Sequence, residues 1–156
     1  MNKDLICAIA NPPGIGAIGI IRLSGVGALD LVKKITSKPT PYREACFVSL
    51  KDEEELLDTG ILISFKGPNS FTGEDLIEFQ GHGNPVIQRR LINYFCRNGA
   101  RLAKPGEFSE RAFLNNKFDL TQAEAIADLI TSKSEAAAKA ALKSLRGDFS
   151  LKVNDL

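Results

Sequence analysis

Short apolar runs separated by turn residues fill the first part of the chain. Residues 5–10 and 17–23 are mostly apolar and rich in isoleucine, and Asn11-Pro12-Pro13-Gly14 lies between them. This pattern predicts two β-strands joined by a rigid turn. From Gly27 onward, apolar residues recur at helical spacing until Pro39. A helix is therefore expected after the second strand.

The middle of the chain continues the strand pattern. Apolar residues 46–50 and 57–65 flank an acidic run at 52–55, which indicates two strands with a solvated hairpin tip. Another strand is expected over residues 75–79, and Gln80-Gly81-His82-Gly83 is expected to end it. These segments predict a sheet of several strands.

A second helix is predicted directly after this glycine-containing segment. Asn84 is a suitable N-cap, and Pro85 suits the first helical position. Apolar residues then recur at helical spacing until Asn98-Gly99. Further along, residues 105–115 are expected to form a loop that ends in one helical turn capped by Ser109.

The last part of the chain is rich in alanine and predicts one long helix. Thr121-Gln122-Ala123-Glu124 matches a capping box at its start. An apolar stripe, broken only at Gly147, consists of Ile126, Leu129, Ile130, Ala137, Ala141, Leu142, Leu145, Phe149 and Val153. The stripe is still running at Leu156 without a C-cap, so we expect the natural helix to continue and the chain to be a fragment.

Composition places the chain among ordinary globular proteins. It has 156 residues, of which 44% are hydrophobic and 25% are charged, and its net charge is +1. Such a charge supplies no strong field for nucleic acid, so any RNA contact is expected to be local. Three scattered cysteines without metal-ligand spacing indicate buried free thiols in the cytoplasm. No stretch is long enough for a membrane span.

Two glycine-rich patterns are typical of nucleotide-binding sites. Residues 14–19 match GxGxxG, but prolines precede the match and β-type residues follow it, so a dinucleotide site is not favoured. The P-loop pattern GxxxxGK[ST] is missing from the sequence. These residues alone are therefore not expected to hydrolyse GTP.

Three polar residues stand out, and each has a structural explanation beside a functional one. His82 is the single histidine and lies between glycines, so its backbone closely approaches either a ligand or a neighbouring strand. Arg22 and Glu78 lie in apolar strands, where a charge must pair, reach solvent or meet a ligand. On the residues alone, a structural histidine and solvated charges at a sheet edge are the commoner explanations.

Several motifs together give the chain a resemblance to a known family. In order along the chain they are Pro12-Pro13-Gly14, Gly19-Ile20-Ile21-Arg22-Leu23-Ser24-Gly25, Gly67-Pro68-Asn69-Ser70-Phe71-Thr72-Gly73-Glu74-Asp75, Gln80-Gly81-His82-Gly83, Pro105-Gly106-Glu107-Phe108, Arg111-Ala112-Phe113-Leu114-Asn115, Lys117, Asp119-Leu120 and Gln122-Ala123-Glu124-Ala125. They resemble the MnmE (TrmE) family of tRNA-modifying GTPases. The resemblance covers nearly the whole chain, which makes it far more specific than any single motif.

The resemblance implies an α+β fold, a mixed β-sheet with packed helices similar to tetrahydrofolate-binding domains. Residues 1–118 would be the folate-binding and dimerisation domain, and residues 119–156 the first helix of a helical domain. The family's GTPase domain, which uses GTP, magnesium and potassium, would lie outside this chain.

The family's activity is modification of the wobble uridine of tRNA. It works with a flavin-dependent partner, MnmG (GidA), and its members are homodimers. The resemblance further implies that 5-formyltetrahydrofolate binds the N-terminal domain and supplies the one-carbon unit.

Carried over by motif, the folate contacts fall on Arg22, Glu78 and Lys117. One carboxylate such as Glu78 can accept from both the ring N–H and the exocyclic amine of a pterin, while the two cations suit carbonyl or carboxylate oxygens. The sequence departs from the family pattern at Asn11, where threonine is usual, and at Ile15, where a polar or charged residue is common.

Two alternatives remain at this point. In the first, the domain is a dimerisation scaffold whose folate pocket is vestigial. In the second, it is a stand-alone enzyme similar to an aminomethyltransferase, which the sequence favours less because it shows no general acid and base pair.

Overall fold

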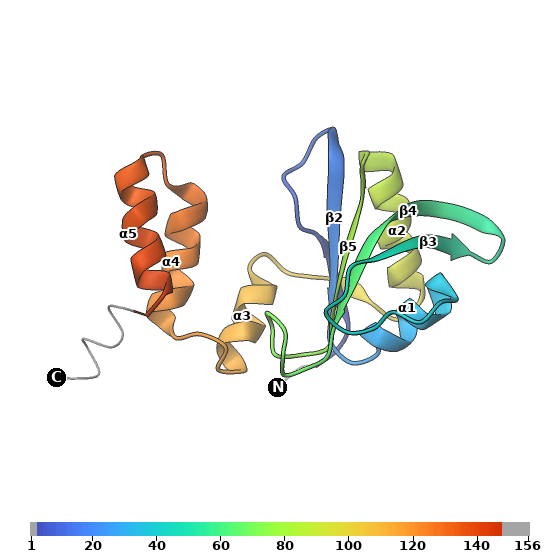
Figure 1. Cartoon of the computed structure of the whole chain (residues 1–156), viewed down its shortest axis with the longest axis horizontal. Coiled ribbons are helices and arrows are strands. Elements are labelled where there is room, and N and C mark those ends of the chain that lie inside the picture. The colour runs from blue at the N-terminus through green and yellow to red at the C-terminus, as the bar shows by residue number, and fades with distance from the viewer. Residues whose placement is uncertain (1–2, 148–156) are drawn as a thin grey trace. The chain divides into compact units, whose positions relative to one another are not determined.

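A mixed six-stranded sheet forms the centre of the first part of the chain. The computed structural model describes residues 3–147 (Figure 1). The strands are β1 (Ile6–Ile9), β2 (Gly16–Ser24), β3 (Cys46–Asp52), β4 (Glu55–Phe65), β5 (Leu76–Gly83) and β6 (Arg101–Leu102). Their order is β3-β4-β5-β2-β1-β6; β1 and β6 are parallel, and the other neighbours are antiparallel. The predicted α+β class is confirmed.

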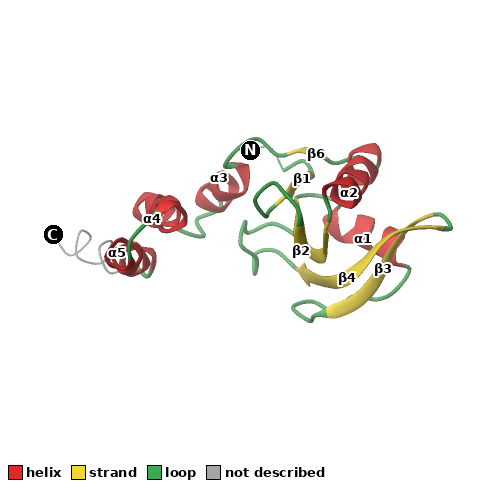
Figure 2. Ribbon diagram, turned by 90° about the horizontal axis from the view of Figure 1, so that it is seen from above, coloured by secondary structure: helices red, strands yellow, loops and turns green. Residues whose placement is uncertain are grey.

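Two helices, α1 (Ala28–Thr36) and α2 (Pro85–Arg97), cover one face of this sheet (Figure 2). Alternate residues of β2 and β5 turn to that face, because successive side chains of a strand point to opposite sides. Leu91 and Phe95 of α2 pack with these strand residues in the hydrophobic core. The buried strand residues of this core include Ile21, Leu23, Val48, Leu50, Leu62, Ile77 and Phe79.

The start of α2 confirms the prediction from sequence. The side chain of Asn84 accepts hydrogen bonds from the backbone N–H groups of Val86 and Ile87, at 2.8 and 3.3 Å, and Pro85 follows as the first helical residue. The predicted hairpin of β3 and β4 is also present, with its turn at Glu53 and Glu54.

The predicted end of β5 is wrong, because the strand continues through Gln80-Gly81-His82-Gly83. Gly81 does not break it. Its missing side chain leaves room for the Asp58 carboxylate and the Phe79 ring, which an added Cβ would overlap. The glycine is therefore a point of close packing within the strand.

The segment after β6 is more helical than predicted. Instead of one turn capped by Ser109, an eight-residue helix, α3, spans Glu107–Leu114. It follows Gly106, whose φ of 76° makes the turn directly before Glu107. An acidic residue at the helix start is favourable because it faces the positive end of the helix dipole. Strand β6 was not predicted, since two residues are too short for a pattern.

The prediction of one long C-terminal helix is also wrong. The structure has two helices, α4 (Leu120–Thr131) and α5 (Glu135–Leu145). The capping box at the start of α4 lies on Asp119 and Gln122, two residues earlier than predicted. Ser134 caps a new helix by accepting from the N–H of Ala137 at 3.1 Å.

The two C-terminal helices pack against each other. Ala125 and Ala141 are buried, and the Gln122 side chain donates to the Leu145 carbonyl at 2.9 Å. Of the predicted stripe, Ile130 and Leu142 are exposed. Phe149 and Val153 lie outside the described residues, as does the expected continuation at Leu156.

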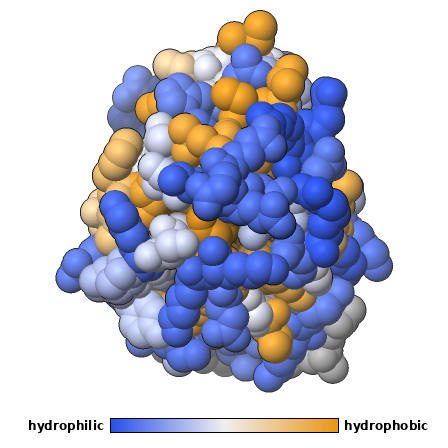
Figure 3. Space-filling view, turned by 90° about the vertical axis from the view of Figure 1, so that its right-hand side faces the viewer, coloured by the Kyte–Doolittle hydropathy of each residue, from blue (hydrophilic) through white to orange (hydrophobic). Residues whose placement is uncertain are grey.

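The chain divides into two compact units, one up to Phe108 and one from Ser109 onward. The first contains the sheet with α1 and α2, and the second contains α4 and α5. No helix within residues 3–147 is long and apolar enough to cross a membrane. The side of the molecule seen in Figure 3 is mainly hydrophilic, with hydrophobic side chains exposed in small groups.

Gly60 in β4 provides a test of how closely the strands are packed. An added Cβ would overlap the carbonyl oxygen of Gln80 in β5, and this oxygen belongs to the backbone and cannot rotate away. We expect Gly60→Ala to lower the free energy of unfolding by about 1–3 kcal/mol, measured by urea denaturation. Gly16→Ala is the matched control, because the nearest atom to its Cβ is Ile18 O at 3.7 Å. Equal stability of the two variants would contradict the close approach.

Candidate functional site

Arg22 and Glu78 lie opposite each other on the two central strands of the sheet. The register pairs Arg22 of β2 with Glu78 of β5, and the row continues to Ile63 of β4 and Ala8 of β1. Their neighbours Ile21 and Phe79 point to the helix-covered core. Arg22 and Glu78 are therefore on the opposite, open face of the sheet. The edge-strand explanation of these charges is wrong, since both strands are interior.

The two side chains form an ion pair. Arg22 Nε lies 3.1 Å from Glu78 Oε2, and the guanidinium carbon lies 5.7 Å from the centre of the Phe71 ring. Gln80 donates from Nε2 to the other oxygen, Glu78 Oε1, at 3.0 Å. The Glu78 side chain is 16% exposed and that of Arg22 is 35% exposed. A carboxylate oxygen has two lone pairs, so Glu78 can still accept from a ligand.

Apolar side chains surround this ion pair on the open face. By register, Ile20 lies beside Gln80, and Ile61 and Ile63 lie on the β4 side. All three isoleucines are half-buried. Further out on the same face, Ile18 is 64% exposed and Phe47 is 69% exposed. An ion pair bordered by apolar side chains can bind a flat ring that carries hydrogen-bond donors at its edge.

Lys117 belongs to the unit that starts at Ser109. Its backbone N–H donates to the carbonyl of Ala112 at 2.9 Å, directly after α3, and Asn116 before it has a φ of 58°. The structure thus brings two of the three predicted residues together. The place of Lys117 relative to Arg22 and Glu78 stays a prediction.

His82 has a partner that sequence reasoning missed. Its Nδ1 lies 2.6 Å from Asp58 Oδ1, and its backbone N–H donates to Asp58 Oδ2 at 3.0 Å. The Thr59 N–H donates to Asp58 Oδ1 at 2.8 Å. Asp58 lies 24 residues before His82, so no short sequence motif links the two residues. The one signal in the sequence was an acidic residue within a mostly apolar strand, where a charge needs a partner.

This pair gives the histidine a fixed orientation. The Asp58 side chain is 4% exposed and holds Nδ1, whereas the His82 side chain is 62% exposed. A carboxylate on one ring nitrogen favours the tautomer with its proton there. Nε2 is then the nitrogen available to accept a hydrogen bond from solvent or a ligand.

The loop around Asn11 is tied to the sheet and to α2. Asn11 Oδ1 accepts from the Ile20 N–H and from Gln88 Nε2, both at 2.9 Å. Gly19 lies in β2, not in a helix, and its missing side chain makes room for Gln88. The GxGxxG match is therefore not a dinucleotide site. Ile15, the other departure from the family pattern, is exposed.

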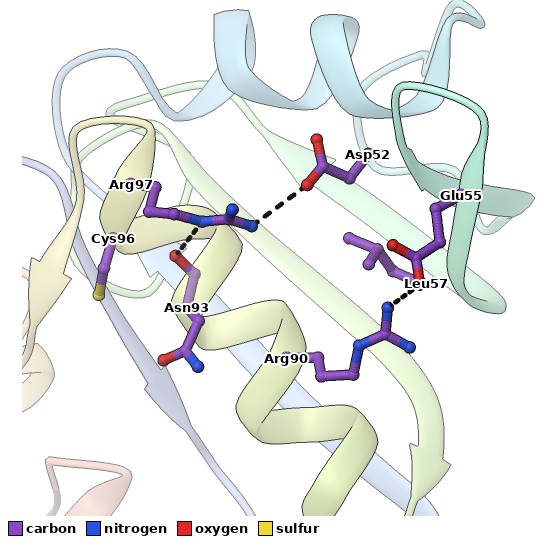
Figure 4. Close-up of a pocket in the computed structure, with 7 residues that line it drawn as sticks. All are labelled: Asp52, Glu55, Leu57, Arg90, Asn93, Cys96 and Arg97. Atoms are coloured by element: carbon purple, nitrogen blue, oxygen red, sulfur yellow. Dashed lines mark hydrogen bonds and ion pairs between the residues drawn. The ribbon is translucent and has the colours of Figure 1, made fainter.

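A surface hollow of about 650 Å³ lies between α2 and the β3–β4 hairpin (Figure 4). Two ion pairs cross it: Arg97 Nη2 lies 3.1 Å from Asp52 Oδ2, and Arg90 meets Glu55. Each cation faces one carboxylate, so the pairs hold the hairpin to the helix. Among the described residues, no group of three or more His, Cys, Asp and Glu could hold a metal ion.

The amino-acid sequence is similar to those of known proteins. A family model described as "GTP-binding protein TrmE N-terminus" matches residues 5–117. The chain is 56% identical to a tRNA modification GTPase MnmE of Francisella tularensis subsp. novicida (strain U112) and 54% identical to one of Francisella philomiragia, over 99% of its length. It spans about a third of the length of these relatives, 34%.

The buried carboxylate of Asp58 is expected to contribute to stability. The Asp58 carboxylate takes part in three hydrogen bonds, with the backbone N–H groups of His82 and Thr59 and with the His82 ring. Asp58→Ala removes this acceptor. We expect a loss of about 2–4 kcal/mol in the free energy of unfolding, measured by urea denaturation. Asp52→Ala is the control, because its ion pair with Arg97 is exposed and should contribute about 0–1 kcal/mol. A loss at Asp58 no larger than at Asp52 would refute this role.

Proposed function

The chain belongs to the family of N-terminal domains of GTP-binding protein TrmE, and from this premise we propose that it is the folate-binding part of a tRNA modification GTPase. In this proposal the whole protein modifies the wobble uridine of tRNA together with the flavoprotein MnmG (GidA), in the cytoplasm. GTP hydrolysis, with magnesium and potassium, is proposed to take place in a part of the whole protein that corresponds to the part of the relatives this chain does not span.

The observation that carries the proposal is the ion pair on the open sheet face. Glu78 retains acceptor capacity beside Arg22, and isoleucines border both. The donor set fits 5-formyltetrahydrofolate: Glu78 would accept from the pterin N–H and amine, and Arg22 would donate to folate oxygens. Lys117 is proposed as the third contact. When bound, the folate supplies the one-carbon unit.

Homodimerisation is proposed through the same unit. Ile18 and Phe47 are strongly exposed on the open face, which places apolar surface where α1 and α2 do not cover the sheet. Exposed apolar residues that share one face favour contact with another protein surface. The occupant proposed here is a second copy of the chain, since symmetric pairs are the commonest oligomers.

One observation favours the alternative of a scaffold with a vestigial pocket. Glu78 and Arg22 already satisfy each other, and Gln80 binds the second carboxylate oxygen. A structural ion pair needs no ligand. The two possibilities differ in a single measurement, because a scaffold shows no saturable binding of reduced folate.

Glu78 provides the test of the folate site. Glu78→Ala removes the acceptor for the pterin donors, and we expect a loss of roughly 1.5–3 kcal/mol, about tenfold or more in affinity, by calorimetric titration with 5-formyltetrahydrofolate. Glu54→Ala in the exposed hairpin turn is the control and should bind like the wild type. Wild-type affinity in a folded Glu78→Ala variant would remove the site assignment.

Ile18 provides the test of the dimer. Ile18→Asp places a charge on the exposed apolar part of the open face, and burying it in an interface is costly. We expect light scattering to give the dimer mass for the wild type and a mass closer to the monomer for the variant at equal concentration. Val26→Asp is the control, because Val26 is also exposed but lies outside the strands. Monomer mass for the wild type at all concentrations would contradict homodimerisation.

A further inference from the structure

Two of the three cysteines lie next to each other. Cys7 of β1 and Cys96 of α2 have their sulfur atoms 3.9 Å apart, although 89 residues separate them in sequence. Cys7 is buried in the core, whereas Cys96 is exposed, so the prediction of three buried thiols is wrong. Figure 4 shows Cys96 at the border of the hollow, with its sulfur pointing away from the two ion pairs.

We propose that Cys7 and Cys96 are a redox modification site, at which a hydroperoxide converts the two thiols into an intramolecular disulfide. The sulfur atoms are already in contact, and a disulfide bond needs them at about 2.05 Å. The two sulfur atoms would have to move closer by less than the distance that a side-chain rotation can cover. The third cysteine, Cys46, lies on β3 and donates to the Glu44 carbonyl at 3.6 Å.

Burial decides which sulfur reacts first. Burial chiefly, with Cys96 nearby, raises the pKa of the Cys7 thiol to about 12, so this thiol stays protonated near neutral pH. The reactive form of a cysteine is the thiolate, and an oxidant must reach it. Cys96 is exposed and Cys7 is not. Cys96 is therefore the residue that meets the hydroperoxide, and Cys7 resolves the product.

The chemistry balances in two steps. The Cys96 thiolate attacks one peroxide oxygen, the O–O bond breaks, and the released alkoxide or hydroxide takes up the thiol proton, which leaves a sulfenic acid on Cys96. Cys7 then gives up its proton, a step that its raised pKa slows, and its Sγ attacks Cys96 Sγ. The S–O bond breaks, and the leaving hydroxide takes up the proton of Cys7 as water. Two thiols are oxidised by two electrons, and the hydroperoxide is reduced to an alcohol or water and a second water.

The disulfide would connect the first strand of the sheet to the end of α2. It would close a long loop that contains β2, α1, β3, β4 and β5. Such a cross-link restricts the unfolded chain and stabilises the fold, unless it strains the native geometry. A raised melting temperature of the oxidised protein is thus the physical signature of a bond formed between native neighbours.

The experiment uses the reduced chain treated with hydrogen peroxide and then digested without reductant. We expect mass spectrometry to find the Cys7 and Cys96 peptides joined, and the intact chain to have lost two hydrogen atoms. The melting temperature should rise by roughly 5–15 °C and return to its starting value after treatment with dithiothreitol. Cys46→Ser should behave like the wild type.

Cys96→Ser is the critical variant, since its exposed position makes the fold insensitive to the change. Cys7 should then stay a free thiol under the same treatment. Cys7→Ala should leave Cys96 without a resolving thiol, so it should proceed to the sulfinic acid. The proposal is overturned if wild-type Cys96 ends as a sulfinic acid while Cys7 remains a thiol, or if the joined peptides are those of Cys46.

Discussion

The pairing of β2 with β5 is the constraint on which the rest of the structure depends. Side chains alternate between the two faces of a strand, so a register is specified wherever one face is buried. In the observed register, Ile21 and Phe79 lie in the core while Arg22 and Glu78 lie on the open face. A slip of one residue would bury two charges and expose the core. The same ladder thus determines both the hydrophobic core and the ion pair.

Close approach of backbones gives this sheet its second constraint. At Gly60 and Gly81, neighbouring strands or side chains occupy the space that a Cβ would need. At Gly81 the space is filled by the Asp58 carboxylate, which also holds His82. Because Gly81 has no side chain, the buried Asp58 carboxylate can lie close to the strand and contact the exposed His82 imidazole. Stability and the orientation of a polar group therefore have one structural cause.

Local signals were sufficient for much of the fold. Asn84 and Pro85 specify the start of α2 because a cap needs only neighbouring residues, and short apolar runs bounded by turn residues predicted β2 and β4. Contacts between residues far apart in sequence could not be predicted from local patterns. The pairs Asp58–His82 and Cys7–Cys96 form only when the strands and helices come together. The single C-terminal helix was predicted wrongly because the apolar stripe keeps helical spacing across Ser132 and Ser134. Two short helices that face each other need the same stripe.

The open face combines two proposed roles, and their shared location has a thermodynamic consequence. Arg22 and Glu78 occupy its centre, while Ile18 and Phe47 lie further out on the same face. A second copy that covered Ile18 and Phe47 would exclude water from the surroundings of the ion pair. Exclusion of water strengthens charged hydrogen bonds to a ligand and raises the cost of leaving a charge unpaired. A ligand that binds Glu78 better in the dimer than in the monomer must favour the dimer by the same factor, because binding linkage is reciprocal. Folate binding and dimerisation, if both occur on this face, are therefore coupled by the geometry of the sheet.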